Sequence, residues 1–312
     1  MLEHIVPPTV QTAHSLSDRA DAGALLFPEE RPAVATAVSS RQAEYATVRA
    51  CARDALTKLG QPPVALVPGE NREPRWPAGI VGSMTHCTGY RGAAVAHDRD
   101  IAALGIDAEP NAPLPDGDGL LNVIAHREEI DLLAALPACG TAWDRLLFSA
   151  KECVYKAWFP LTGRWLGFEE AIVRISPAGT FEAQLLVEGP TLDGEVLDGF
   201  SGTWLHADGL LLTAIAVPYR RTSERGVGNE ARAGPVKGAT VSTGRRRTSC
   251  RREDRRDHRL RATAGAPGRL AAVLGPADVR SDAYGPADAP SVPAPSVDVV
   301  PAVRLHRRPV PG

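Results

Sequence analysis

Two acidic residues, Asp107 and Glu109, stand two positions apart at the end of an apolar run that begins at Ile101. If this run is a strand, both carboxylates point to the same face, because side chains alternate between faces along a strand. Two like charges on one face repel unless a cation lies between them. Oxygen ligands suit a hard ion such as magnesium, which leaves its other positions to water and substrate phosphates. The pair indicates a metal site, although an isolated D-x-E is more often a solvated strand end.

A second group of charged residues lies on a predicted helix over 143–158. Glu152 and Lys156 are four residues apart, so they share a face of this helix, with Lys151 and Tyr155 on the neighbouring face. On a solvated surface such a pair would contribute little stability. Four apolar residues would instead dock the helix on the protein body: Phe148, Val154, Ala157 and Trp158. Glu152 would then supply a third oxygen ligand, with a lysine one turn away for a pyrophosphate.

The segment VGSMTHC, residues 81–87, combines small residues with a histidine. Gly82, Ser83 and Thr85 give a flexible, hydroxyl-bearing turn, and His86 follows it. A lone histidine is more often a structural or surface residue than a functional one. A basic group beside residues small enough to let a phosphate approach closely nevertheless indicates phosphate binding.

Two arginines on a predicted helix upstream could also bind phosphate. Arg41 and Arg49 lie eight residues apart, just over two helical turns, and so occupy nearly the same face. Guanidinium groups bind phosphate through paired hydrogen bonds, so the two could clamp it. Arg53 follows on the same helix and is an equally good candidate. A solvated arginine on a helix surface is the ordinary alternative.

Three segments occur in a fixed order: V-G-S-M-T-H at 81–86, G-I-D-A-E at 105–109 and F-S-A-K-E-C-V-Y-K-A at 148–157. Together they resemble the signature motifs of the Sfp-type phosphopantetheinyl transferases, in the enterobactin-synthase-like branch that is common in actinobacteria. Three motifs in the same order and spacing are far more specific than any one of them. The likeness covers about residues 10–218.

The resemblance implies roles for the acidic and basic residues of these motifs. Asp107, Glu109 and Glu152 match the magnesium-binding acids of the family. Lys156 matches the lysine that contacts the phosphates of coenzyme A, and His86 matches a histidine beside the 3′-phosphate. Glu152 is also the best candidate for the base that accepts the proton of the attacking serine.

Further contacts with coenzyme A are implied by less specific matches. Arg41 and Arg49 look like the paired arginines of this branch. Arg72, in PGENREPRWP, resembles its basic residue near the adenine. Thr85, next to His86, belongs to the same phosphate-binding turn.

The resemblance also implies an activity and a fold. The enzyme would transfer the phosphopantetheine arm of coenzyme A to a serine of an acyl or peptidyl carrier protein and release 3′,5′-ADP, as polyketide, nonribosomal peptide or fatty acid synthesis requires. The fold would be α+β, with two similar halves in a pseudo-two-fold arrangement and the active site between them. We expect magnesium as the cofactor, coenzyme A and a carrier protein as partners, no nucleic acid or membrane partner, and a monomer.

Apolar periodicity predicts the elements that position these residues. Helices are predicted over 33–58, 123–135 and 143–158, and strands over 93–97, 101–107, 171–176, 181–187, 202–207 and 210–217. The first two strands flank the polar turn Asp98-Arg99-Asp100 and would form a hairpin. Helix followed by strands occurs twice, which favours two halves, residues 1–110 and 111–219.

The C-terminal part of the chain differs in kind from the rest. Residues 221–312 hold 18 Lys and Arg against 9 Asp and Glu, whereas residues 1–220 hold 17 against 28. The basic run and the Ala-, Pro- and Gly-rich stretch after it cannot bury enough apolar surface to offset chain entropy. We expect residues 220–312 to form a disordered tail.

Cysteine usage and hydropathy bear on the compartment. The five cysteines are scattered and include no CxxC pair, which suits a reducing cytosol. The N-terminal MLEHIVPPTV lacks the basic and apolar regions of a signal peptide, and the longest apolar run, Leu210 to Val217, is too short to span a membrane. We therefore expect a soluble, cytoplasmic protein.

Two other functions fit parts of the sequence. A magnesium-dependent phosphohydrolase would use the same three acids with an activated water, and would release 3′,5′-ADP from coenzyme A without a protein acceptor. A nucleic-acid-binding protein would act through the basic tail, so truncation after Tyr219 would abolish its function and its affinity would fall steeply with salt.

Overall fold

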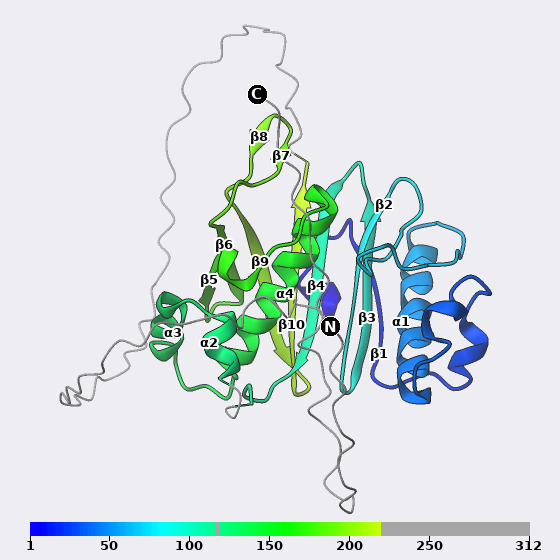
Figure 1. Cartoon of the computed structure of the whole chain (residues 1–312), viewed down its shortest axis with the longest axis horizontal. Coiled ribbons are helices and arrows are strands. Elements are labelled where there is room, and N and C mark those ends of the chain that lie inside the picture. Colours follow the sequence, from blue (N-terminus) through cyan, green and yellow to red (C-terminus); the bar gives the residue numbers. More distant parts are fainter. Residues whose placement is uncertain (116–118, 220–312) are drawn as a thin grey trace, which may run out of the picture.

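The computed structural model describes residues 1–115 and 119–219, and the predicted tail over 220–312 lies outside them. Two antiparallel sheets form its centre, and a helix of 20 residues packs on each (Figure 1). Helix α1 (Ser39–Lys58) covers the first sheet and helix α4 (Trp143–Thr162) covers the second. This mixture of helices and antiparallel sheets confirms the predicted α+β class.

The first sheet has three strands in the order β1-β3-β2, namely β1 (Gln11–Ser15), β3 (Tyr90–His97) and β2 (Ile80–Cys87). The central strand β3 pairs antiparallel with both neighbours. Small and branched side chains let α1 lie close to this sheet: Cys51, Ala52, Ala55, Leu56, Ala93 and Val95. The sheet and helix therefore share one apolar core.

The second sheet has five strands in the order β4-β10-β9-β6-β5. These are β4 (Ile101–Pro110), β10 (Leu210–Pro218), β9 (Gly199–Ala207), β6 (Thr180–Leu185) and β5 (Ala171–Ser176). The long pairing of β4 with β10 joins a strand from the middle of the chain to one near the end of the described part. The sheet is thus built from residues on both sides of position 110.

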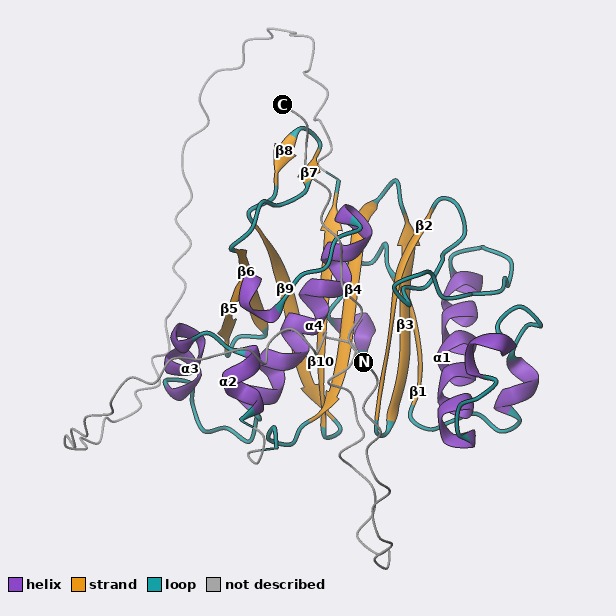
Figure 2. Ribbon diagram, viewed as in Figure 1, coloured by secondary structure: helices purple, strands orange, loops and turns teal. Residues whose placement is uncertain are grey.

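Short elements complete the described chain (Figure 2). They are the helices α2 (Leu120–Ile124) and α3 (Arg127–Ala134), the strands β7 (Thr191–Leu192) and β8 (Glu195–Val196), and the 3₁₀ helices η1 (Leu2–His4), η2 (Ala22–Leu25), η3 (Arg31–Val34) and η5 (Phe168–Glu170). No helix within residues 1–115 and 119–219 is long and apolar enough to cross a membrane.

The predicted hairpin between residues 93–97 and 101–107 is wrong. The turn exists, with the Asp100 amide donating to the His97 carbonyl at 3.0 Å. However, β1 and β2 already occupy both edges of β3, so β4 leaves the first sheet and pairs with β10. The hairpin partner of β3 is β2, which precedes it in the chain.

Two helix boundaries also differ from the prediction. The helix expected over 33–58 begins only at Ser39, because η3 and an extended Val38 precede it. The helix expected over 123–135 is divided into α2 and α3. His126 begins α3 with an extended backbone, and its amide donates to the Glu129 carboxylate at 2.7 Å, which stabilises a new helix start at this point.

Side-chain hydroxyls connect the two sheets where β2 faces β4. The Ile106 amide donates to Ser83 Oγ at 3.1 Å, and the Ala108 amide donates to Thr85 Oγ1 at 3.1 Å. These hydroxyls satisfy backbone groups that no neighbouring strand reaches on that edge. The polar residues of the 81–87 segment therefore hold the sheets together at their junction. The flexible turn predicted for this segment is wrong, because Gly82, Ser83 and Thr85 lie within strand β2 and pair with β3.

The close approach of α4 to β4 depends on Gly105. A β-carbon at this position would lie 2.2 Å from the Cys153 carbonyl oxygen, a backbone atom that cannot rotate away. Replacement by alanine should force the helix and the strand apart.

We predict that Gly105→Ala lowers the free energy of unfolding by about 1–3 kcal/mol or more, as overpacking of a tight core does. Chemical denaturation measures this change. Gly23→Ala is the matched control, because a β-carbon there meets no atom within 4 Å. An unfolding free energy of Gly105→Ala equal to that of Gly23→Ala would contradict the proposed contact.

Candidate active site

The carboxylate of Asp107 lies at the junction of the two sheets and is fully buried. Thr85 Oγ1 donates to its Oδ1 at 3.0 Å and Ser149 Oγ donates to its Oδ2 at 2.9 Å. The Lys156 ammonium lies 2.7 Å from Oδ1. Strands β2 and β4 and helix α4 therefore meet at this one carboxylate.

Burial explains why the carboxylate needs these partners. Strand β4 is buried along its length from Ile101 to Glu109, so Asp107 cannot exchange its hydrogen bonds with bulk water. An ionised carboxylate in such a place is stable only when it is paired and hydrogen-bonded. Lys156 is held there by a second bond, from its ammonium to the Ile106 carbonyl at 3.0 Å.

Glu109 is also buried, and an arginine pairs with it. Arg145 Nη1 lies 3.2 Å from Glu109 Oε2. The same guanidinium donates to the carbonyls of Ala112 and Pro113, at 3.1 Å each, and is thereby fixed on the chain that follows β4. The sequence analysis did not predict a role for Arg145. Its position in the first turn of the predicted helix over 143–158, on the same helix as Glu152, was the available signal.

The third predicted acid, Glu152, is buried on α4, one turn from Ser149 and one turn from Lys156. Because α4 packs against β4, Glu152 lies on the element that faces Asp107 and Glu109. Glu152 therefore lies on α4 between Ser149 and Lys156, the two residues of this helix that contact Asp107.

Magnesium suits these acids by the chemistry of the donors. Asp107 pairs with Lys156 and Glu109 pairs with Arg145, and Glu152 is the third acidic residue of the group. Oxygen ligands of this kind favour a hard divalent ion. Within the described residues, however, no three His, Cys, Asp or Glu side chains are gathered closely enough to hold a metal ion.

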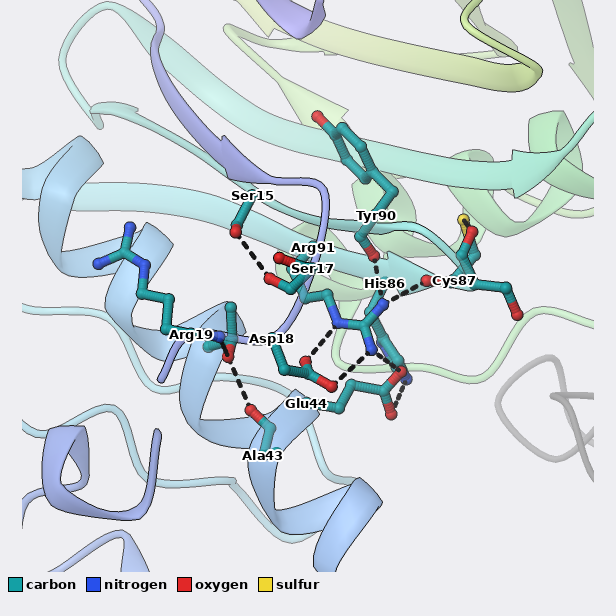
Figure 3. A network of polar contacts seen from close by, with 12 residues as sticks. Ser15, Ser17, Asp18, Arg19, Ala43, Glu44, His86, Cys87, Tyr90 and Arg91 are labelled. Atoms are coloured by element: carbon teal, nitrogen blue, oxygen red, sulfur yellow. Dashed lines mark hydrogen bonds and ion pairs between the residues drawn. The ribbon is translucent and has the colours of Figure 1, made fainter. Parts of the chain in front are cut away.

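Two of the residues predicted to bind the 3′-phosphate lie together. Arg41 Nη1 lies 2.6 Å from His86 Nε2, although the residues belong to α1 and β2. Glu44 contacts both of them, and Figure 3 shows His86 and Glu44 facing each other between the helix and the β2–β3 hairpin. Arg41 and His86 are therefore in contact, and the Arg41 side chain is exposed.

The other arginines of α1 point into the protein. Arg49 is buried, donates to the Leu66 carbonyl at 2.9 Å and stacks on the Tyr45 ring, and this burial lowers the pKa of its guanidinium to about 10. Arg53 is buried against the Glu30 carboxylate, at 2.8 Å. Periodicity correctly places Arg41 and Arg49 on one helix but does not show that the helix buries the second.

Arg72 and Thr85 also occupy places that the sequence did not indicate. Arg72 is exposed in a loop closed by the bond from the Gly69 amide to the Glu73 carbonyl, and its backbone is left-handed with φ 66°. Thr85 is buried and uses its hydroxyl on Asp107 and on the Ala108 amide. Thr85 therefore supports the Asp107 carboxylate by a hydrogen bond from the protein interior.

Comparison with known proteins identifies the family. Residues 29–96 match the 4′-phosphopantetheinyl transferase N-terminal domain, and residues 103–203 match the 4′-phosphopantetheinyl transferase superfamily. The chain belongs to the 4′-phosphopantetheinyl transferases.

Individual relatives agree with this assignment. The transferase is 52% identical over 241 residues to 4′-phosphopantetheinyl transferase Svp of Streptomyces mobaraensis, a match that covers 75% of this chain and 97% of the relative. It is 47% identical to 4′-phosphopantetheinyl transferase Npt of Nocardia iowensis, over 69% of this chain and 99% of the relative. Enterobactin synthase component D of Salmonella typhimurium is 30% identical, over 64% of this chain and 83% of the relative.

A buried ion pair behind the site of the transferase was not predicted. Lys151 lies 2.8 Å from the Glu129 carboxylate, and both side chains are almost fully buried. The Lys151 ammonium also donates to the carbonyls of Phe168 and Ala171, and the Val173 amide donates to Glu129. This pair fixes α4 to α3 and β5. Lys151, which belongs to the 148–157 motif, therefore stabilises the fold.

Thr85 should contribute to the stability of the transferase through Asp107. Thr85→Val keeps the shape of the side chain but leaves a buried carboxylate and a buried amide each one hydrogen bond short. We expect the free energy of unfolding to fall by about 1–3 kcal/mol, as for other buried groups that lose a partner. Denaturant titration measures it, with the exposed Thr180→Val on β6 as the control. Equal stability of the two variants would exclude the bond to Asp107.

Proposed function

We propose that this transferase moves the phosphopantetheine arm of coenzyme A onto a serine of an acyl or peptidyl carrier protein at the junction of β4 and α4. Family membership supports the reaction. The observation that supports the place is the buried Asp107 carboxylate, with Lys156 at 2.7 Å and with Glu109 and Glu152 on the same strand and the facing helix. A fixed set of charges suits phosphoryl transfer, in which positioning and electrostatic stabilisation supply most of the catalysis.

Lys156 is proposed to contact the pyrophosphate of coenzyme A. Its side chain is partly exposed while its ammonium is held by Asp107 and the Ile106 carbonyl. An ammonium has three donors, so it can bind a phosphate oxygen from this fixed position. Charge on the pyrophosphate increases as the bond to the leaving group breaks, and a lysine placed there stabilises that change.

Glu152 is proposed to accept the proton of the serine hydroxyl. The serine oxygen attacks the β-phosphorus, a new phosphorus–oxygen bond forms, and the bond to the bridging oxygen breaks, so that 3′,5′-ADP leaves. The position of Glu152 on α4, one turn from Lys156, supports this role, because a general base has to lie close to the group that binds the phosphate.

Asp107, Glu109 and Glu152 are proposed to hold magnesium together with the pyrophosphate of coenzyme A, because the three carboxylates are the type of oxygen donor that this ion prefers but do not form a complete ligand set by themselves. When bound, it would neutralise charge on the pyrophosphate. Arg41 and His86 are proposed to hold the 3′-phosphate, which does not react, and Arg72 to lie near the adenine. Arg49 and Thr85 are proposed to support the site from the protein interior. Arg49 donates to the Leu66 carbonyl, and Thr85 donates to the Asp107 carboxylate.

We further propose that the transferase is a cytoplasmic monomer. Cys51, Cys87, Cys139 and Cys153 form no disulfide within the part of the chain that the structure describes, in keeping with a reducing compartment. Carrier proteins for polyketide, nonribosomal peptide, siderophore or fatty acid synthesis are the candidate acceptors.

The intact mass of an apo carrier protein tests the function. Incubation with the transferase, coenzyme A and magnesium should add one phosphopantetheinyl group, and a carrier whose acceptor serine is replaced by alanine should gain nothing. Omission of magnesium with a chelator present should stop the transfer, and added magnesium should restore it. Release of 3′,5′-ADP without any carrier modification would contradict the proposal and indicate a phosphohydrolase.

A further inference from the structure

Five ionisable side chains meet where α1 faces the β2–β3 hairpin, and they are called the Glu44 cluster here: Asp18, Arg41, Glu44, His86 and Arg91. Figure 3 shows Glu44 on the helix facing His86 and Arg91 on the hairpin. Arg41 and His86 are the residues proposed to bind the 3′-phosphate. The other three were not predicted as site residues.

Arg91 is the fixed end of the cluster. Its Nε and Nη2 donate to the two carboxylate oxygens of Asp18, at 2.7 and 3.1 Å, and its Nη1 donates to the Cys87 carbonyl at 2.6 Å. Paired bonds of this kind fix the plane of a guanidinium. Arg91 is also the cross-strand partner of His86, so the support of the cluster and the histidine share one rigid hairpin.

Glu44 connects Arg91 to Arg41 and His86. Its Oε1 lies 3.7 Å from Arg91 Nη2, and its Oε2 lies 2.5 Å from Arg41 Nη1 and 3.2 Å from His86 Nε2. The side chain of Glu44 is 19% exposed, whereas that of Arg41 is 47% exposed. A partly buried carboxylate therefore holds a long, exposed arginine side chain against the histidine.

Glu44 holds Arg41 beside the imidazole. A guanidinium only donates, and Arg41 Nη1 donates to Glu44 Oε2 while it lies 2.6 Å from His86 Nε2. The same Oε2 lies 3.2 Å from that imidazole nitrogen. Without Glu44, Arg41 would regain its rotamer freedom, and a ligand would have to supply the free energy to order it again.

We propose that Glu44 is a positioning residue that sets Arg41 and His86 side by side for the 3′-phosphate of the adenosine ligand. This inference rests on the proposed function, because that function assigns the 3′-phosphate to Arg41 and His86. It assigns Glu44 a role in selectivity: the residue favours ligands that carry a 3′-phosphate over those that lack it.

The alternative is that the Glu44 carboxylate competes with the ligand for the same two donors. The link from Glu44 Oε1 to Arg91 opposes this, since Arg91 is anchored on Asp18 and draws the carboxylate towards the hairpin. The two alternatives predict opposite effects when the charge of Glu44 is removed. Positioning predicts weaker binding of the 3′-phosphate, and competition predicts tighter binding.

Calorimetric binding of two nucleotides to the full chain tests the proposal. The probes are 3′,5′-ADP and 5′-AMP, which differ only in the 3′-phosphate. Wild type should prefer 3′,5′-ADP, and Glu44→Gln should reduce that preference about tenfold through weaker binding of 3′,5′-ADP alone, the loss expected for a charge-assisted contact. Glu128→Gln is the matched control, because Glu128 on α3 makes an exposed ion pair with Arg174 on β5. It should leave the preference unchanged.

Each other outcome overturns the proposal. An unchanged preference in Glu44→Gln means that Glu44 does not position the pair, and an increased preference means that it competes. An equal loss for both nucleotides indicates a general structural role. If wild type itself shows no preference, the 3′-phosphate assignment fails as well, while the carrier mass assay still decides the reaction. If Glu44→Gln does not fold, Glu44→Asp, whose shorter side chain withdraws from Arg41 and His86, is measured in the same way.

Discussion

The buried carboxylate of Asp107 is the constraint on which the rest of the site depends. A charge without access to water has to be neutralised by groups that the fold itself supplies. Here they come from two elements: Thr85 on β2, and Ser149 and Lys156 on α4. The helix can approach closely enough because position 105 has no side chain. The same contacts that satisfy Asp107 therefore hold the two sheets and α4 in register.

The charged groups around Asp107 and around Glu44 differ in how much they contribute to the stability of the transferase. The Asp107–Lys156 pair is largely shielded, and breaking one partner of such a pair typically costs several kcal/mol, on the order of 3–5. The Arg41–Glu44 pair is partly exposed, and exposed pairs contribute only about 0.2–1 kcal/mol to stability. The first group fixes the fold and the site together, whereas the second can affect ligand choice with little effect on folding. This difference suits a reacting centre at the core and a recognition group at the surface.

Strand and helix periods predicted the parts of the site that depend on local sequence. They placed Asp107 and Glu109 on one strand, and Glu152 and Lys156 on one helix, and the structure has both elements. Pairing of distant strands could not be predicted in this way, so the partner of β4 was missed. Burial of Arg49 and the roles of Arg145 and Glu44 also depend on contacts between residues far apart in the chain. Local patterns identify candidate residues, and only packing decides which of them reach the site.

A double-mutant cycle on Asp107 and Lys156 tests the central claim most directly. The unfolding free energies of Asp107→Asn, Lys156→Met and the double variant are measured by denaturant titration. If the ammonium neutralises the buried carboxylate, each single change lowers the unfolding free energy. The loss in the double variant is then smaller than the sum of the two single losses, by a coupling free energy of about 1–3 kcal/mol. Effects that add to within about 0.5 kcal/mol would contradict the account, because the two charges would then be independent.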